Sequence, residues 1–406
     1  MDHRPCYLGN RRAQDGTVTM TIPDHSVIRR IASWGADTVA TSLYLDVDGL
    51  RHPRWPDVVQ RVDHLFRSAR QQARLTTSGS EAEVEADLVE IHAWLDRGFD
   101  RSATRGVALF SRAGEGLFES IQLRMPVRDQ VVVDPEPDVA QLCVVAATSW
   151  SAIAVAVDKE RSHVVRLERD GEADELDVLD DTMPRSVDVD IELGGFERHE
   201  AELAREHFRR VAHGVSAEMA RQPARYLVLF GTEGSVAQLE AYLPPNVAER
   251  VAARKSLPSD AGTKELVAAA QESVESAQQE RRSAVLATLR ERAVTTGTSV
   301  VTGLDSTLSA LGSEQVATLI VERTFEAPGG RCEDCRVLVG VVGARRCPRC
   351  GGRLHDTANV VDGAIADAFL RHSALAPVDD GSLHDLGCIG ALVHRWATTP
   401  RGAGGA

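Results

Sequence analysis

The sequence predicts an α/β (α+β) chain of three domains, the third of which is interrupted by a four-cysteine segment. Short apolar runs with the period of a strand alternate with amphipathic helical stretches along most of the chain. A proline-containing acidic segment at 133–138 is typical of a linker. A length of 406 residues, at roughly 100 to 200 residues per domain, leaves room for two to four domains.

The N-terminal α/β domain is predicted at 1–137. It opens with a strand in VATSLYLDVDG, where apolar and polar side chains alternate up to an Asp-Gly turn. Helices are expected at about 57–75 and 80–98, followed by short strands in GVALFSR, LFESIQL and DQVVVDP. Beside the first turn, the carboxylates of Asp46 and Asp48 favour turn chemistry over a metal site.

The middle α/β domain is predicted at 138–262. It starts with QLCVVAAT, and the following SAIAVAVDKERSHVVRLERD predicts a hairpin. The acid-rich stretch 171–192 is expected to be an exposed loop, and a Gly-Gly loop then leads into a long amphipathic helix at about 197–221. A buried strand at 225–231 comes next, then a helix that breaks at a Pro-Pro pair and restarts.

The C-terminal α/β domain is predicted at 263–406. A long charged helix at 261–295 leads into it, followed by a helix at about 302–312 and a strand at 316–322. After the cysteine segment come a helix at 359–371 and a closing strand in GCIGALVHRW, and the final RGAGGA is expected to be a disordered tail. The cysteine segment is therefore an insertion between a strand and a helix.

The cysteine segment carries the strongest chemical signal. Cys332-Glu-Asp-Cys335 and Cys347-Pro-Arg-Cys350 are two CxxC knuckles, flanked by glycines that permit tight turns. Four thiolates brought together by a short hairpin supply the tetrahedral site that zinc prefers, so the segment predicts a zinc ribbon at 331–354. Iron-sulfur clusters usually show other spacings, and a redox dithiol does not need two knuckles. Because four cysteines close the coordination sphere, we expect a structural Zn²⁺ and not a catalytic one.

The charge of the chain is unevenly distributed. The formal net charge is -14, and residues 151–200 hold 15 acidic and 6 basic residues, which leaves the other 356 residues nearly balanced. An acidic total argues against a general basic nucleic-acid coat, although the balanced remainder allows local basic patches toward RNA. No apolar run reaches the roughly 18 to 20 residues that cross a bilayer. We expect a cytoplasmic protein without a membrane or DNA partner.

Several segments together resemble a known superfamily. The strand VATLIVERTF, the run Ala327-Pro328-Gly329, the four-cysteine ribbon and the ending LGCIGAL resemble the third domain of the archaeal-eukaryotic class-1 release factor superfamily, which includes Pelota and bacterial relatives. SLYLDVD near the start, and RYLVLFG followed by LPPNVAERV, resemble the bacterial branch. The resemblance covers about 39–396 and implies a three-domain release-factor-like architecture.

The resemblance also implies where the functional residues lie. Members of this superfamily occupy the ribosomal A site, and the hydrolytic members carry Gly-Gly-Gln before the long helix of the middle domain. The corresponding segment here reads ELGGFERHE, and no Gly-Gly-Gln occurs anywhere in the chain. The resemblance therefore implies a loop close to the ribosome or tRNA but no catalytic residue, and this loop comprises Gly194, Gly195, Phe196, Arg198 and His199.

Two alternatives about this helix stay open in the sequence. His199 with Glu200 is a candidate substitute base, but adjacent residues on a helix do not share a face. Arg209 and Arg210 are candidate rRNA contacts, and the simpler interpretation places Phe208 in the core with both arginines exposed. No stop-codon motif such as Asn-Ile-Lys-Ser occurs in 1–137, so a decoding role is not expected.

Three functions from different classes follow. The first is a non-hydrolytic factor that occupies the A site of idle 70S ribosomes during stress, or hibernation, and the resemblance implies delivery by elongation factor Tu. The alternative is a peptidyl-tRNA hydrolase, acting in release or rescue with a substitute for the glutamine. The third is a stress-response interaction protein that does not touch the ribosome. In the first case, we expect the acids of 171–192 to lie away from rRNA or to contact a protein.

Overall fold

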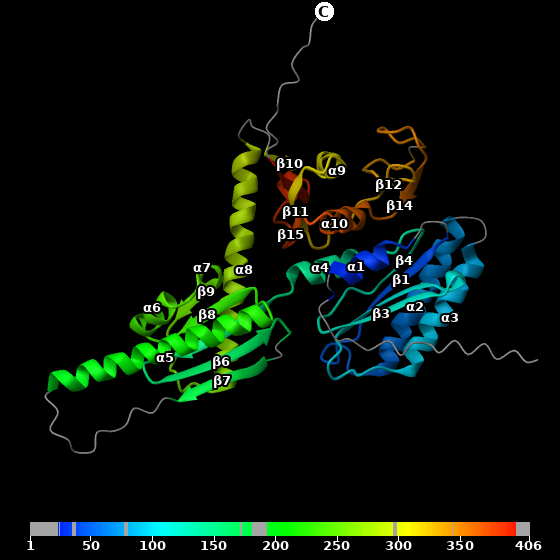
Figure 1. The fold of residues 1–406 in the computed structure, drawn as a ribbon. Helices are drawn as coiled ribbons and strands as arrows, with labels where there is room; N and C mark the ends of the chain where they lie inside the picture. Colours follow the sequence, from blue (N-terminus) through cyan, green and yellow to red (C-terminus); the bar gives the residue numbers. More distant parts are fainter. Residues whose placement is uncertain are drawn as a thin grey trace, which may run out of the picture. The chain divides into compact units, whose positions relative to one another are not determined.

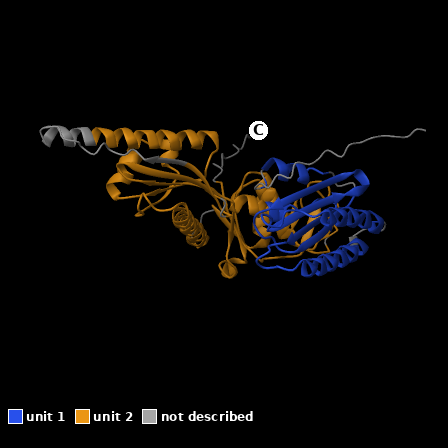
Figure 2. Cartoon of the chain, turned by 90° about the horizontal axis from the view of Figure 1, so that it is seen from below, with its two compact units in different colours: residues 1–142 blue, residues 143–406 orange. Residues whose placement is uncertain are grey.

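The computed structural model describes residues 23, 25–34, 38–76, 80–170, 173–180, 193–294, 299–343 and 345–394, and for 76, 177–180 and 193–200 it describes the backbone alone. The chain forms two compact units, the first unit (residues 1–142) and the second unit (residues 143–406), which are coloured separately in Figure 2. Both units combine helices with sheets, as predicted. Within the described ranges, no helix has the length and apolar character needed to span a bilayer.

A four-stranded antiparallel sheet of order β3-β2-β1-β4 forms the base of the first unit (Figure 1). Its strands are β1 (Ala40–Asp46), β2 (Gly106–Arg112), β3 (Leu117–Leu123) and β4 (Gln130–Asp134). The helices are α1 (His25–Ala32), α2 (Trp55–Thr76) and α3 (Ser80–Arg97), with the single turn η1 (Ala113–Glu115) after β2. The helices and strands predicted from the periodicity of this region are confirmed.

Alternate side chains of β1 and the residue after it lie on opposite faces of the sheet. Leu43, Leu45 and Val47 are fully buried in one core with the apolar sides of α2 and α3. Tyr44, on the opposite face, meets the ring of Phe110 edge-on at 5.9 Å. Burying apolar side chains on one face against two helices supplies most of the stability of such a unit.

Asp46 and Asp48 at the end of β1 organise the turn, as predicted. The Asp48 N–H donates to Asp46 Oδ1 at 2.9 Å, and the Leu50 N–H donates to Asp48 Oδ1 at 2.9 Å. Arg51 and His52 lie 3.4 Å and 3.6 Å from the Asp46 carboxylate. Among the described residues, these acids belong to no cluster of metal-ligand side chains.

A buried carboxylate joins α3 to the sheet. Asp87 is 1% exposed and accepts hydrogen bonds from Thr41 Oγ1 (2.8 Å), Ser111 Oγ (3.0 Å) and the Ala113 N–H (2.7 Å). Burial outweighs these bonds and raises the pKa of Asp87 to about 6. Near neutral pH, burial of the ionised Asp87 carboxylate therefore costs free energy of folding, while its hydrogen bonds hold α3 on the sheet.

The second unit begins with a five-stranded sheet of order β7-β6-β5-β8-β9, here called the middle sheet. Its strands are β5 (Ser151–Val157), β6 (Arg161–Glu168), β7 (Ala173–Asp180), β8 (Tyr226–Phe230) and β9 (Val251–Lys255). Helix α4 (Ala140–Thr148) crosses the boundary between the two units, and the helices that follow are α5 (Leu193–Arg221), α6 (Glu233–Ala241), α7 (Pro245–Ala248) and α8 (Thr263–Ala293). The predicted β5–β6 hairpin and the helix restart at the Pro-Pro pair are confirmed.

The side chains of β5 differ in size between its two faces, and each face packs against a different long helix. Ile153, Val155 and Val157 point to a core that includes α5 and α6, whereas Ala152, Ala154 and Ala156 point to the opposite face and α8. Figure 1 shows α5 and α8 at the middle sheet, with α5 running along it. Large side chains thus fill the α5 side, and small side chains leave room for α8 and the larger residues of β8.

The expectation of a loop throughout 171–192 is wrong for 173–180, which form β7 and pair antiparallel with β6. The strand lies at an edge of the middle sheet. Charged side chains are common on edge strands because they discourage pairing with another chain. The acids of this strand therefore concealed its structure, and residues 171–172 and 181–192 lie outside the described residues.

A second sheet, of order β10-β16-β11-β15, forms the C-terminal part of the second unit. Its strands are β10 (Val300–Thr302), β11 (Val316–Glu322), β15 (Ala374–Val378) and β16 (Ile389–Val393), accompanied by α9 (Leu304–Gly312), α10 (Val360–Leu370) and the turn η2 (His384–Leu386). The cysteine segment lies between β11 and α10, as predicted. Leu289 of α8 is buried in the core of this sheet with Ile320.

We predict that Ala154→Leu destabilises the second unit by about 1 to 3 kcal/mol, because a larger side chain on this face meets α8 without room to relax. Urea unfolding of the full chain measures the change. The matched control is Ala220→Leu at an exposed position of α5, which we expect to leave stability almost unchanged. Equal effects at the two positions would show that the small-residue face is not tightly packed.

We predict that Asp87 makes the first unit less stable as pH rises. Because its folded pKa of about 6 exceeds the usual value of 3.8, the folded state binds the extra proton, and stability falls between about pH 4 and pH 6. Asp87→Asn removes this contribution, worth on the order of 2 to 3 kcal/mol. Urea unfolding of both proteins from pH 4 to pH 7 tests it, since other groups cancel in the difference. A pH-independent difference contradicts the prediction.

Candidate metal centre and the Gly-Gly helix

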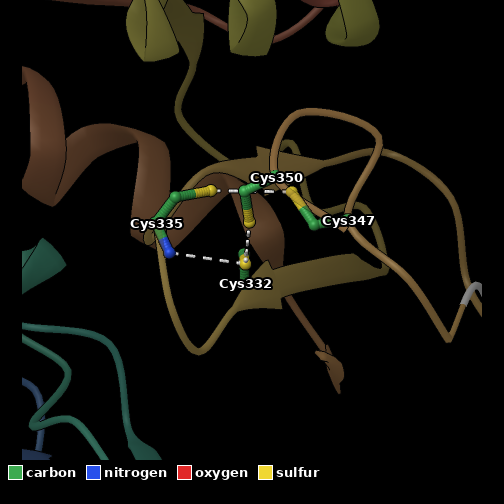
Figure 3. A group of neighbouring side chains, drawn as sticks. All are labelled: Cys332, Cys335, Cys347 and Cys350. Atoms are coloured by element: carbon green, nitrogen blue, oxygen red, sulfur yellow. Dashed lines mark hydrogen bonds between the residues drawn. The ribbon is translucent and has the colours of Figure 1, made fainter. Parts of the chain in front are cut away.

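The four predicted ligands Cys332, Cys335, Cys347 and Cys350 come together. Their sulfur atoms all lie within 4.8 Å of one another and point toward a common centre (Figure 3). Two sulfur pairs, Cys332 with Cys350 and Cys335 with Cys347, are each 3.5 Å apart. A tetrahedron with zinc–sulfur bonds of about 2.3 Å has edges of about 3.8 Å, whereas a disulfide needs about 2.05 Å. The donor set and its spacing therefore fit a tetrahedral metal ion.

A small sheet positions the ligands. It has the order β13-β12-β14, with β12 (Gly329–Cys332), β13 (Leu338–Val339) and β14 (Leu354–Thr357). Cys332 ends β12, and the other three ligands lie in the turns that follow. Cys332 and Cys347 are buried, together with Leu354, in a small core of this sheet. The hairpin register thus brings two distant CxxC pairs together.

Backbone N–H groups surround the sulfurs. The Cys335, Arg349 and Gly352 N–H groups donate to Cys332 Sγ (3.5 Å), Cys347 Sγ (3.4 Å) and Cys350 Sγ (3.4 Å). Such donors stabilise thiolates and orient them toward a metal. Gly351, with φ +77°, makes the turn that aims the last of these donors, and a side chain there is strained.

The thiols differ in acidity. Although burial opposes ionisation, the N–H groups of Cys350 and Arg349 lower the pKa of Cys347 to about 7. The Gly352 N–H favours the Cys350 thiolate, but the neighbouring Cys335 and Cys332 thiols raise its pKa to about 12. A metal ion that binds all four sulfurs as thiolates therefore displaces protons near neutral pH.

The Gly-Gly segment begins a helix. Helix α5 starts at Leu193, so the backbone of Gly194 and Gly195 lies in its first turn, where the sequence predicted a loop that leads into a helix at 197. The side chains of Phe196, Arg198 and His199 lie outside the described residues. The role of this segment near the ribosome or tRNA stays a prediction.

The described side chains of α5 show how the helix is held. Phe208 is fully buried in the core beside β5 and β8, as the simpler interpretation expected. Arg209 and Arg210 are exposed. The Arg209 guanidinium pairs with Glu206 at 2.8 Å and lies 5.5 Å from the centre of the Tyr242 ring. Contact of either arginine with rRNA stays a prediction.

Other exposed arginines of α5 follow the same pattern as Arg209. Arg205 pairs with Glu202 at 3.0 Å, and Arg221 pairs with Glu218 at 2.8 Å, each with the acid three residues earlier. Within each pair, the positive and the negative charge neutralise each other on the exposed side of the helix. Exposed pairs of this kind contribute little to stability.

A cavity in the first unit was not foreseen. It has a volume of about 420 Å³ and lies between α2 and β4. On its wall, Arg61 Nη1 donates to Asp129 at 2.5 Å, while Nη2 donates to the Asp46 carbonyl at 2.7 Å. Arg61 and Asp129 are 68 positions apart in the sequence, so no short-range pattern predicts that they pair. Because Arg61 is held by both groups, we interpret it as support for the sheet edge.

The middle region matches a known protein family. Residues 137–279 match the family described as bacterial archaeo-eukaryotic release factor family 10. These residues contain the middle sheet, α5 and the first half of α8. No curated protein matches the chain.

Several solved structures align with the chain at low identity. The crystal structure of an archaeal translation termination factor aligns over 91% of this chain and 96% of its own, with 15% identity and a TM-score of 0.26. Archaeoglobus fulgidus Pelota aligns over 72% of this chain and 80% of its own, with 13% identity and a TM-score of 0.30. A translation termination-like factor of S. cerevisiae involved in RNA quality control aligns over 72% and 81%, with 8% identity and a TM-score of 0.40.

The resemblance seen in the sequence and the family match thus agree on the same region. Residues 137–279 thus match bacterial archaeo-eukaryotic release factor family 10, and this region lies within the part of the sequence that resembles the release-factor and Pelota superfamily.

Proposed function

We propose that this release-factor-like protein binds the A site of the 70S ribosome in the cytoplasm without hydrolysing peptidyl-tRNA. The observation that carries the proposal is the Gly-Gly pair in the first turn of α5, within the family match but followed by phenylalanine in place of glutamine. Glutamine is the residue that would position water at the ester. A factor that keeps the glycines and lacks the glutamine retains a shape that fits the site without the chemistry.

The anchoring of α5 supports this role. Among its described side chains, the buried ones begin at Ala204 and continue through Phe208 to Met219. The backbone from Gly194 to Ala204 spans about 15 Å at about 1.5 Å per residue. The core thus holds α5 from Ala204 onward, and in this proposal the turns before Ala204 face the partner.

The proposed action is occlusion during stress. A hibernation factor that fills the A site of idle ribosomes needs shape complementarity and contacts with phosphates, and it needs no catalytic group. The hibernation factor Balon, which this chain resembles, also lacks the glutamine. We include delivery by elongation factor Tu in the proposal, because the same resemblance implies it. The acids that precede α5 are then expected to face away from rRNA or toward a protein partner.

We predict that the protein sediments with ribosomes, more strongly from starved cells than from growing cells. Sucrose-gradient fractions of both cultures, probed for the tagged full-length protein, measure this. Absence from the ribosome fractions of both cultures removes the proposal. In a parallel reaction with ribosome-bound peptidyl-tRNA, we expect no release above background. Release that is lost in Gly194→Ala/Gly195→Ala would instead support the hydrolase.

We further propose that the four-cysteine site holds a structural Zn²⁺. We expect about one zinc ion per chain, bound more weakly as pH falls from 8 to 6 because protons compete for the thiolates. Cys347→Ser should lose the metal and loosen the ribbon. Cys388→Ser, outside the cluster, is the control and should keep it. Elemental analysis and a competing chelator measure both. Full zinc content in Cys347→Ser contradicts this assignment.

A further inference from the structure

The zinc ribbon carries an unusual charge pattern. The segment 345–353, here called the second knuckle, holds four arginines and no acid in nine residues, in a chain whose net charge is -14. The four side chains are all exposed, and they are Arg345, Arg346, Arg349 and Arg353. This density of exposed positive charge requires a physical explanation.

The arginines of the second knuckle differ from three exposed arginines of α5. The exposed arginines 205, 209 and 221 of α5 each pair with a nearby acid. Within the part of the chain that the structure describes, none of the four arginines of the second knuckle forms an ion pair. Their charge is therefore available to a partner.

Two of the arginines are forced together. Arg346 and Arg353 form an isolated antiparallel bridge, which places their side chains opposite each other. Like charges directly opposite across strands are destabilising. A ligand with negative charge relieves this repulsion, and this explains why such a pair is useful on a surface.

Two guanidinium groups are also held in place. Arg346 Nη1 donates to the Gly351 carbonyl at 3.1 Å, and Arg349 Nη1 donates to the Gly312 carbonyl at the end of α9 at 2.7 Å. Each group keeps further donors, because a guanidinium has five N–H bonds. Orienting the side chains before binding reduces the entropy lost when a ligand binds.

Compensation of the metal site does not account for all of this charge. Zn²⁺ with four thiolates has a net charge of about −2, so it balances two of the four arginines. The side-chain hydrogen bonds of the second knuckle go to carbonyls and not to sulfur. The first CxxC turn adds two exposed acids, Glu333 and Asp334, and a fifth exposed arginine, Arg336. The positive charge of the five arginines therefore still exceeds the negative charge of the metal site and the two acids together.

We propose that the second knuckle is a surface that binds the phosphate backbone of RNA. Arginine forks match phosphate geometry and contact it without reading sequence. Gly351 and Gly352 follow Cys350, so the backbone adds little bulk beside Arg353. The proposal deepens the proposed function and rests on it for the identity of the RNA as ribosomal.

The test compares two double variants of the full-length protein. Arg345→Gln/Arg353→Gln removes two charges of the second knuckle whose side chains make no hydrogen bond to other described residues. The control, Arg54→Gln/Arg70→Gln, removes the same charge from exposed arginines that pair with Asp57 and Glu85. The probes are 70S ribosomes and a fluorescein-labelled RNA duplex, titrated at several salt concentrations. Zinc content is measured in each protein.

We expect the knuckle variant to bind both probes roughly tenfold more weakly than wild type. The slope of its log binding constant against log salt concentration should be smaller in magnitude by about one for each lost phosphate contact. The control should bind like wild type. Arg345→Lys/Arg353→Lys should recover most of the binding, since charge is retained; recovery separates lost charge from a misfolded ribbon. Unchanged affinity and salt dependence in a knuckle variant that retains zinc overturn the proposal, as does binding of polyglutamate in preference to RNA.

The outcomes separate this proposal from the proposed function. If the wild type binds the duplex through the second knuckle but not ribosomes, the A-site role fails and the RNA surface stands. If the wild type and both double variants bind ribosomes equally, the A-site role stands and the RNA surface fails.

Discussion

The size alternation along β5 is the constraint on which the second unit depends. Isoleucine and valine on one face and alanine on the other let two long helices occupy opposite sides of the same strand. Since side chains of a strand alternate by necessity, seven residues determine which helix packs on which face. The position of α5, and with it the Gly-Gly segment, follows from the larger face. The path of α8 follows from the smaller one.

The two candidate sites use different kinds of support. The Gly-Gly segment depends on a helix whose described side chains are packed in an apolar core from Ala204 onward. The cysteine site depends on three short strands, N–H donors to sulfur and a small core that contains two of its own ligands. So small a core supplies little burial, and metal coordination is the means by which such ribbons are usually stabilised. The exposed arginines thus lie on an element that has only a small apolar core of its own.

Short-range patterns predicted most of this structure, and long-range pairing accounts for the rest. The spacing of the cysteines and the alternation in β1 each depend on residues close in sequence. The cysteine cluster and the strand could therefore both be predicted. The strand β7 was missed because its acids hide the alternation, and its partner β6 supplies the register. The short β10 and the proline-containing β15 gave no strand signal, since both depend on neighbours far along the chain. The Arg346–Arg353 bridge likewise exists only once the hairpin is formed.

Helix α8 takes part in two cores. Leu266, Ala270 and Val274 are buried against the middle sheet, and Leu289 is buried in the core of the C-terminal sheet. Between them, residues 275–288 contain no buried side chain. Local opening costs least where few apolar contacts hold a segment. Amide exchange along this single helix should therefore be slow near both ends of the packed region and faster between them, so that one continuous helix behaves as two cooperative folding units joined by a weaker segment.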